Sequence, residues 1–296
     1  MTQDVTQWNV SSEYIRKQEE KRNDTDKERS FEFGGRAVVL RDGCRGMPLV
    51  LSHAAFLDSR MFDAVWEPLA KHFCVIRYDM RGFGQSSPVT GPLCRRGDLD
   101  QLLKHLEVTE AHSVGCSNGG QISLDLALEQ PQRFKSLTLV DSTPSGFELH
   151  GEPPRYMLEM FDAMQKGDIN HSNELQIRIW LDGETREPEQ VDLMLRRKAL
   201  EMNRIPVSQS TFFIADTQPI NPLIPPAITQ LESVNCPTLV IAGALDHPEV
   251  LRAADEMVKR IPNAKKTIIA STGHVPSYEQ PDAFVKLLLD FLGNVK

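Results

Sequence analysis

A serine lies at the centre of a glycine-rich turn, GCSNGG (115–120). An apolar run at 111–115 precedes the turn and helical spacing starts at 118, so the G-x-S-x-G pattern joins an expected strand to an expected helix. Glycine two positions before and after the serine lets the two backbones approach closely. The helix start provides a positive dipole end and the free N–H of Asn118. The turn therefore predicts Ser117 as a nucleophile.

A glycine-rich turn between a strand and a helix can also bind phosphate. The turn at 115–120 lacks the Lys-Ser/Thr pair of a P-loop and the glycine spacing of a dinucleotide fingerprint. We therefore expect no nucleotide cofactor. The chemistry expected of Ser117 needs no metal or organic cofactor either.

Alternating strand-like and helical segments surround this turn and indicate how it is positioned. Six runs rich in β-branched and apolar residues are expected as strands buried on both faces: 48–53, 73–79, 111–115, 136–141, 237–243 and 266–270. Apolar residues recur three or four apart in most of the gaps, which predicts helices over 60–71, 98–107, 118–129, 249–260 and 281–292. This alternation predicts an α/β fold with a mostly parallel, doubly wound sheet.

One long interval breaks the alternation. No strand-like run occurs between Asp141 and Pro237, whereas helical spacing recurs at 153–166, 172–181 and 188–203. We therefore expect a helical cap inserted at 147–222. It would interrupt a single α/β core formed by 30–146 and 223–296.

The N-terminal part of the chain has a different composition. Residues 1–29 are predominantly polar with mixed charge, which predicts a polar arm, either a solvated helix or a disordered segment. The following segment, FEFGGRAVVLRD (31–42), is expected to form two strands around a tight turn at Gly34-Gly35.

Composition and charge exclude several classes of protein. The 296 residues are 40% hydrophobic and 25% charged, as is ordinary for a globular protein. No apolar run approaches the roughly 20 residues needed to span a bilayer, so we expect no membrane segment. The excess of 41 acidic over 33 basic side chains gives a net charge of −8, which repels phosphate backbones. Nucleic acid is not expected as a partner.

The cysteines and the N-terminus bear on the cellular compartment. Five widely spaced cysteines without a C-x-x-C pair predict reduced thiols and no zinc site. The first residues lack the basic-then-apolar order of a secretory signal. Both features favour a cytoplasmic protein.

Five segments together resemble the α/β-hydrolase family, and the resemblance extends from about Phe31 to Leu292. LSHAAFLDSRMFD resembles the family's oxyanion segment, RYDMRGFGQSS its strand-4 loop and VGCSNGG its nucleophile turn, while IAGALD and STGHVPSYEQPDAF resemble its acid and histidine loops. The usual His-Gly of the oxyanion segment is His53-Ala54 here, which requires a backbone conformation that alanine tolerates. Cys116 occupies a position at which the residue type varies within the family.

A nucleophilic serine needs a base and a group that orients the base. Among eight histidines, His274 follows the last expected strand and is placed at the carboxyl edge of the sheet, beside the serine turn. The resemblance implies Asp246 as the acid, since the order serine, acid, histidine is that of the family. Its rival is Asp141, which also ends a strand. Asp246 is favoured because GALD resembles the usual acid loop.

The resemblance also implies the oxyanion donors and part of the substrate pocket. The expected donors are the backbone N–H groups of Ala55 and Asn118. Phe56 and Val275 adjoin expected catalytic positions, and Trp180 belongs to the apolar set of the cap. These three residues are expected to line the substrate pocket. The resemblance further implies that His53 steadies the oxyanion loop.

Three functions follow as hypotheses. The leading one is hydrolysis of a small, apolar acyl or aryl ester or a lactone through an acyl-serine intermediate. The second is a carbon–carbon bond hydrolase of the same fold, in which Arg178, Arg196 or Arg197 would bind a substrate carboxylate. The third is a ligand-binding receptor with a hydrolase fold.

Overall fold

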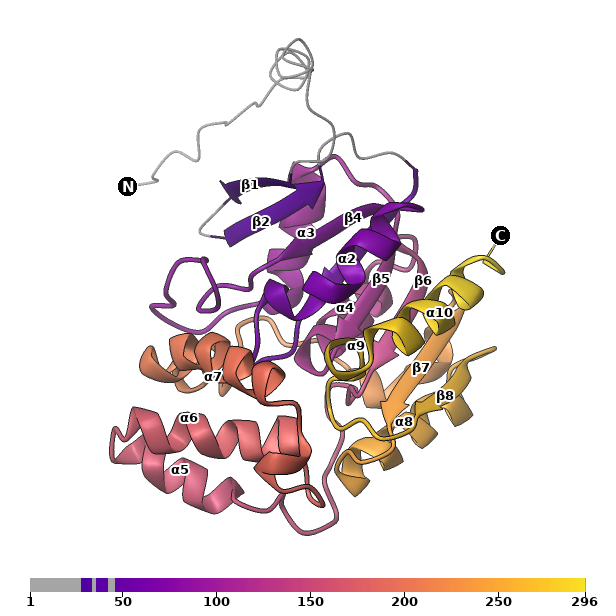
Figure 1. Cartoon of the computed structure of the whole chain (residues 1–296). Coiled ribbons are helices and arrows are strands. Elements are labelled where there is room, and N and C mark those ends of the chain that lie inside the picture. Colours follow the sequence, from indigo (N-terminus) through magenta and orange to yellow (C-terminus); the bar gives the residue numbers. More distant parts are fainter. Residues whose placement is uncertain (1–27, 34–35, 42–45, 296) are drawn as a thin grey trace, which may run out of the picture.

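An eight-stranded sheet runs through the part of the chain that the structure describes (Figure 1). The structure is a computed structural model that describes residues 28–33, 36–41 and 46–295. In spatial order, the strands are β1 (Glu28–Phe33), β2 (Arg36–Arg41), β4 (Cys74–Tyr78), β3 (Pro48–Ser52), β5 (Ala111–Cys116), β6 (Phe134–Val140), β7 (Thr238–Gly243) and β8 (Lys265–Ile269).

The strand directions confirm the predicted class of fold. Strands β3 to β8 pair parallel with one another, while β1 pairs antiparallel with β2 and β2 antiparallel with β4. The chain passes from β4 on one side of β3 to β5 on the other side. The loops after β3 and β5 therefore meet at the point where the strand order reverses, which is where open α/β sheets bind ligands.

Helices cover both faces of this sheet (Figure 1). One face carries α2 (Asp63–Ala70), α9 (Pro276–Glu279) and α10 (Pro281–Leu292), and the other carries α3 (Arg95–His105), α4 (Asn118–Glu129) and α8 (Pro248–Arg260). Neighbouring strand residues alternate between the two cores: Leu49 and Leu51 pack with the first group and Val50 with the second. This alternation is the period of two that a strand imposes.

Three longer helices lie between β6 and β7 in the sequence. They are α5 (Met157–Gln165), α6 (Ile169–Ile177) and α7 (Leu193–Ser208), and a π-helical turn, η2 (Arg178–Asp182), continues α6. We refer to α5, α6, η2 and α7 as the inserted helices. They lie side by side, on the side of the sheet where β7 and β8 end (Figure 1). Shorter turns are η1 (Ser59–Phe62), η3 (Pro188–Gln190), η4 (Phe212–Asp216), η5 (Ala227–Thr229) and η6 (Leu231–Ser233).

Capping side chains explain where α6 and α7 begin. The helix expected over 188–203 begins later, at the first residue of α7. The reason is that the Asp192 carboxylate accepts hydrogen bonds from the N–H groups of Met194 and Leu195. Asp168 caps α6 in the same way, accepting from the N–H of His171, so this helix begins before the expected residue 172. The spacing of apolar residues located these two helices, and the capping side chains determine the residue at which each begins.

Two expectations are wrong. Strand β8 is not buried on both faces, because it forms the edge of the sheet and the side chain of Ile268 is 50% exposed. The thiols are not all reduced: Cys74 is disulfide-bonded, whereas Cys94, Cys116 and Cys236 are free. Disulfides persist in oxidising compartments, so this bond does not support the expected cytoplasmic location.

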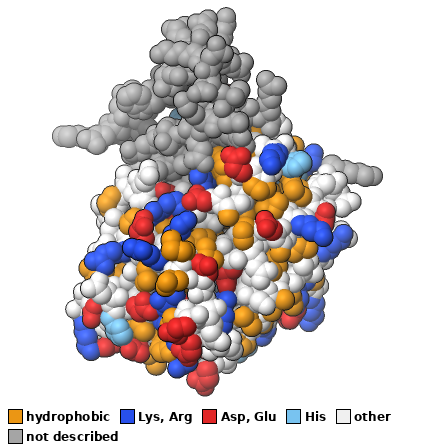
Figure 2. Space-filling model, in the orientation of Figure 1, with side chains coloured by type: hydrophobic (Ala, Val, Ile, Leu, Met, Phe, Trp, Pro, Cys, Tyr) orange, Lys and Arg blue, Asp and Glu red, His pale blue; other side chains and the backbone are white. Residues whose placement is uncertain are grey.

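Several expectations fall partly or wholly outside the described residues. The expected arm at 1–29 lies there except for its last two residues, which belong to β1, and so does the turn at Gly34-Gly35. Among the residues described, no helix has the length and apolar character needed to cross a membrane. Acidic and basic side chains are interspersed among hydrophobic ones over the face seen in Figure 2.

Candidate active site

Ser117 occupies a sharp turn between β5 and α4. Its backbone has φ 53° and ψ −119°, a conformation that residues with a Cβ rarely adopt. The Ser117 N–H donates to the carbonyl of Val140 at 2.8 Å, which ties the turn to the end of β6. The serine side chain thereby lies at the carboxyl edge of the sheet, at the point where the strand order reverses.

The two glycines that flank the serine are required by close backbone contacts. A Cβ on Gly115 would lie 2.3 Å from the carbonyl oxygen of Gly119. A Cβ on Gly119 would lie 2.2 Å from the carbonyl oxygen of Ser52, at the end of β3. Both distances are far below van der Waals contact, so the serine turn fits against β3 only with glycine at these positions.

His274 and Asp246 complete a line of hydrogen bonds from the serine. The Nε2 atom of His274 lies 2.7 Å from Oγ of Ser117, and its Nδ1 atom lies 2.7 Å from Oδ2 of Asp246. His274 follows β8, and Asp246 lies in the loop between β7 and α8. Their side chains are almost completely buried. The structure therefore brings together three residues that are up to 157 positions apart in the sequence.

The rival acid, Asp141, lies directly behind this line. It follows β6, is 2% exposed, and forms a hydrogen bond with the carboxyl group of Asp246. Its own carboxyl oxygens accept from the N–H of Gly243 at 3.0 and 3.1 Å. Of the two carboxyl groups, only that of Asp246 is hydrogen-bonded to His274.

Cys116 is next to the serine but is not placed as a nucleophile. Its Sγ donates to the carbonyl oxygen of His274 at 3.5 Å and is completely buried. Burial, together with the nearby carboxyl groups of Asp141 and Asp246, raises the pKa of the Cys116 thiol well above its ordinary value. The thiolate form is therefore suppressed, and a thiol is a poor nucleophile.

The expected oxyanion donors are the backbone N–H groups of Ala55 and Asn118. The carbonyl of Ala54 accepts from Nδ1 of His53 and from the N–H of Leu57, and in a trans peptide the N–H of Ala55 points the opposite way. The N–H of Asn118 belongs to the first turn of α4, where helices leave donors unpaired. Neither N–H donates to another of the described residues. Ala54 has no positive φ, so alanine is accommodated in place of glycine.

His53 and Asp79 hold the loops around these donors. Nε2 of His53 accepts from the N–H of Met80 at 2.9 Å, which leaves Nδ1 as the donor to Ala54. Burial lowers the pKa of His53, which agrees with a neutral imidazole. The Asp79 carboxylate accepts from the N–H groups of Ser59 and Gln85, both at 2.8 Å.

The three expected pocket residues have different surroundings. The Trp180 ring of the inserted helices lies 4.8 Å from the His274 ring, centroid to centroid, and the Phe56 ring lies 6.4 Å from it. Val275 is fully buried in the core cluster that also contains Phe56. Aromatic rings from both the core and the inserted helices therefore flank the ring of His274.

A contact that the sequence does not indicate connects the inserted helices to the histidine loop. Arg186 follows η2 and donates from Nη1 to the Glu279 carboxylate at 2.6 Å, while Glu279 also accepts from the N–H of Gly273 at 2.7 Å. Gly273 directly precedes His274. Burial raises the pKa of Glu279, and the Arg186 guanidinium acts in the opposite direction. No periodicity or motif marks either residue.

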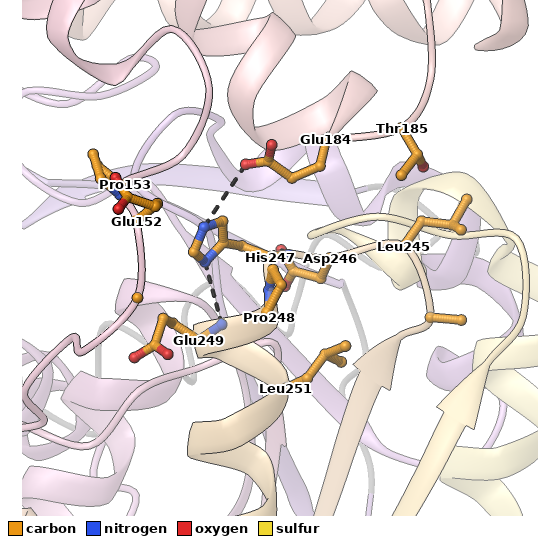
Figure 3. A pocket seen from close by; sticks show the side chains of 12 residues that line it. Glu152, Pro153, Glu184, Thr185, Leu245, Asp246, His247, Pro248, Glu249 and Leu251 are labelled. Atoms are coloured by element: carbon orange, nitrogen blue, oxygen red, sulfur yellow. Dashed lines mark hydrogen bonds and ion pairs between the residues drawn. The ribbon is translucent and has the colours of Figure 1, made fainter.

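A cavity of about 500 Å³ lies beside the loop that carries Asp246 (Figure 3). Its walls come from residues 151–153, 184–185, 244–249 and 251, and neither Ser117 nor the expected pocket residues line it. Nε2 of His247 points toward the Glu184 carboxylate at 3.7 Å, and its Nδ1 accepts from the N–H of Glu249 (Figure 3). Within the described ranges, no group of three or more His, Cys, Asp or Glu side chains could hold a metal ion.

A comparison with protein families agrees with this fold and site. Residues 47–281 match the model of the alpha/beta hydrolase fold. The match covers most of the chain and includes the positions of Ser117, Asp246 and His274. The chain belongs to the α/β-hydrolase family and is an enzyme of hydrolase type.

Relatives within this family catalyse different hydrolyses. The chain is 28% identical to a pimeloyl-[acyl-carrier protein] methyl ester esterase from Nitrosomonas europaea, over 81% of this chain and 93% of that protein. It is 25% identical to a 2-hydroxy-6-oxononadienedioate/2-hydroxy-6-oxononatrienedioate hydrolase from Cupriavidus pinatubonensis, over 79% of this chain and 81% of that protein.

A solved structure and a longer relative complete the comparison. Est816, an N-acyl homoserine lactone degrading enzyme, superimposes with a TM-score of 0.69 at 25% identity, covering 89% of this chain and all of that one. The chain also matches, at 28% identity over 89% of its length, an acetyltransferase component of the acetoin cleaving system from Pseudomonas putida, of which it spans 66%.

Proposed function

We propose that the protein is a serine hydrolase that cleaves a small, apolar carboxylic ester or lactone through an acyl-serine intermediate. The observation that carries this proposal is the pair of 2.7 Å contacts from Ser117 to His274 and from His274 to Asp246. This is the geometry that a serine needs for activation, since its hydroxyl is a weak nucleophile without a positioned base.

In the proposed reaction, Oγ of Ser117 attacks the carbonyl carbon of the substrate while Nε2 of His274 accepts the hydroxyl proton. The Asp246 carboxylate holds Nδ1–H of His274 and stabilises the imidazolium that forms. The N–H groups of Ala55 and Asn118 stabilise the negative charge on the carbonyl oxygen. His274 then protonates the leaving alcohol. Water, deprotonated by the same imidazole, releases the acid and regenerates the serine.

The surroundings of the histidine favour an apolar acyl or aryl group. Trp180 and Phe56 flank the His274 ring, and both present aromatic surface rather than charge. Aromatic walls bind apolar substrate groups through burial of surface area. The esterase and lactone-degrading relatives act on acyl substrates, which agrees with this class.

The carbon–carbon bond hydrolase is the second candidate, because one relative carries out that type of reaction. It would need a free cation for the substrate carboxylate, and the cap arginines are engaged elsewhere. Arg178 donates to Tyr156 and Glu187, and Arg196 pairs with Asp182 and Glu174. The remaining candidate, Arg197, is exposed on α7. This pairing favours the ester or lactone.

The test combines covalent labelling with turnover of a p-nitrophenyl short-chain ester. A fluorophosphonate is expected to label the wild-type protein on the peptide that contains Ser117. Ser117→Ala is expected to lose the label and at least about a thousandfold in kcat/KM. Ser208→Ala removes an exposed serine of α7 and is expected to change neither measurement.

Each other outcome selects a different conclusion. A label on any other residue of active protein refutes the assignment of Ser117. Cleavage of a vinylogous diketone with only weak ester turnover selects the carbon–carbon bond hydrolase. Ligand binding without product, unaffected by Ser117→Ala, selects the receptor.

A further inference from the structure

Asp141 is a buried acidic residue that the proposed reaction does not use. It has a positive φ of 43°, and its N–H donates to the carbonyl of Ile241 at 2.9 Å. Both carboxyl oxygens accept from the N–H of Gly243, and the carbonyl of Gly243 in turn accepts from the N–H of Asp246. The ends of β6 and β7 thus fix the Asp141 carboxyl group on both sides.

This position brings the carboxyl group of Asp141 into contact with that of Asp246 inside the protein. Asp246 uses Oδ2 to accept from Nδ1 of His274 and Oδ1 to accept from the N–H of His247. The Asp141 carboxyl group is hydrogen-bonded to the same side chain, and the two residues are 2% and 8% exposed. Two carboxylate ions cannot share a hydrogen bond, because neither has a proton to donate.

The other groups around Asp141 do not supply a positive charge. Glu279 faces it from α9 and Cys116 from the end of β5. Glu279 is itself paired with Arg186. Burial, followed by the charge of Asp246, raises the pKa of Asp141 well above its ordinary value. The proton shared by the two groups therefore resides on Asp141, because Asp246 faces the histidine.

We propose that Asp141 is a positioning residue: as a neutral acid it donates a hydrogen bond to Asp246 and so holds the Asp246 carboxylate against Nδ1 of His274. This inference rests on the proposed function. The Asp141 carboxyl group is hydrogen-bonded to Gly243 and Asp246, so its effect on the reaction passes through Asp246. Removing the carboxyl group of Asp141 is therefore expected to alter the base, His274, rather than the nucleophile, Ser117.

Two variants separate the hydrogen bond from the charge. In Asp141→Asn, the amide oxygen still accepts from Gly243 and the amide nitrogen still donates to Asp246. We expect kcat within about threefold of wild type and an unchanged acid limb of the kcat/KM profile against pH. Asp141→Gly removes the donor but accommodates the positive φ. Thermal unfolding of both variants checks that they are folded.

The glycine variant is expected to lose about 10- to 100-fold in kcat with little change in KM, which is the effect of a lost hydrogen bond to a charged group. Without the donor, the Asp246 charge interacts more strongly with the imidazolium. The acid limb is therefore expected to move to higher pH by about half a unit or more. A purely structural role would lower the amount of active enzyme without moving the limb.

Two results overturn the inference. If the acid limb of Asp141→Asn moves to lower pH, Asp141 carries a negative charge in the wild type and is not a donor. If Asp141→Gly keeps both the wild-type kcat and the wild-type limb, the contact does not influence the histidine. Each result is read on the purified full chain with the same ester.

Failure of the proposed function gives a different signature, namely folded wild-type protein with neither ester turnover nor a label on Ser117. The inference is then tested by proton NMR of the Nδ1–H of His274, which needs no substrate. The downfield resonance of this proton is expected in the wild type and in Asp141→Asn, and it is expected to shift upfield or vanish in Asp141→Gly. Identical spectra of all three proteins overturn the inference.

Discussion

Ser117 combines an ordinary side chain with an unusual backbone conformation. Its φ of 53° carries a cost of about 1 to 3 kcal/mol, which the surrounding structure must offset. The hydrogen bond to Val140 and the close fit against β3 hold the turn in place. The reactivity proposed for the hydroxyl comes from these contacts and from His274, since serine by itself is unreactive.

Asp125, on α4, gives a prediction about stability and pH at the same scale. Burial raises the pKa of this carboxyl group to about 6, although Ser145 donates a hydrogen bond to it. In the unfolded chain the group ionises near pH 4. As the pH rises from about 4 to 6, the unfolded chain loses this proton first, so this group lowers the free energy of unfolding over that range and above it.

Asp125→Asn is therefore expected to raise the free energy of unfolding at pH 8 by on the order of 2 kcal/mol and to change it little at pH 4.5. Urea unfolding at the two pH values measures the difference. Asp290→Asn, at an exposed position on α10, serves as the control and is expected to give no such pH dependence. Equal effects of Asp125→Asn at both pH values would contradict the prediction.

At the scale of elements, four loops lie at the carboxyl edge of the sheet. Ser117 follows β5, Asp246 follows β7 and His274 follows β8, while Ala55 follows β3. A parallel sheet places all of these strand ends on the same edge. The distances between the side chains then depend on how closely the loops approach. A Cβ on Gly119 would lie 2.2 Å from the carbonyl oxygen of Ser52, and a Cβ on Gly243, at the end of β7, would lie 1.9 Å from the carbonyl oxygen of Gly273.

The close approach of the serine turn to β3 predicts a strong effect of one added methyl group. Gly119→Ala is expected to destabilise the protein by more than about 2 kcal/mol or to prevent folding, because backbone must move. Gly91→Ala is the matched control, since nothing lies within 4 Å of the added Cβ, and is expected to change stability by less than about 0.5 kcal/mol. Chemical unfolding measures both. Similar stabilities of the two variants would refute the steric argument.

At the scale of the whole molecule, the inserted helices are connected to the core by buried charged groups as well as by apolar contacts. Arg186 and Glu279 form an ion pair whose side chains are 12% and 6% exposed. Removing one partner of a buried pair leaves the other charge uncompensated, whereas removing both is far less costly. This pair therefore couples the inserted helices to the loop that carries His274.

Arg186→Met is expected to lower the free energy of unfolding by about 3 kcal/mol. The double variant Arg186→Met/Glu279→Gln is expected to recover part of this loss, because no unpaired carboxylate remains. Arg204→Met, which removes an exposed arginine bonded to Asn170, is the control and is expected to stay within about 0.5 kcal/mol of wild type. Wild-type stability of Arg186→Met would show that the pair is not coupled to the fold.

The sequence by itself determined the class of fold and the order of its elements. Short apolar runs rich in β-branched residues, with helical segments between them, indicate a parallel α/β sheet, because these patterns reflect local geometry and burial. It also indicated the serine turn, since the strand, the glycines and the helix are contiguous. Helix ends were less well determined, because caps such as Asp192 compete with the periodic pattern. The exposure of β8 followed from its place at the edge of the sheet.

Only the tertiary structure decided which acid contacts His274. Asp141 and Asp246 both follow strands, and the strand order brings both carboxyl groups to the same buried place, where one contacts the histidine and the other contacts its neighbour. The pairing of Arg186 with Glu279 and that of Arg196 with Glu174 are likewise contacts between different elements of the chain. Such contacts depend on how the elements pack, and local sequence patterns carry no information about that packing.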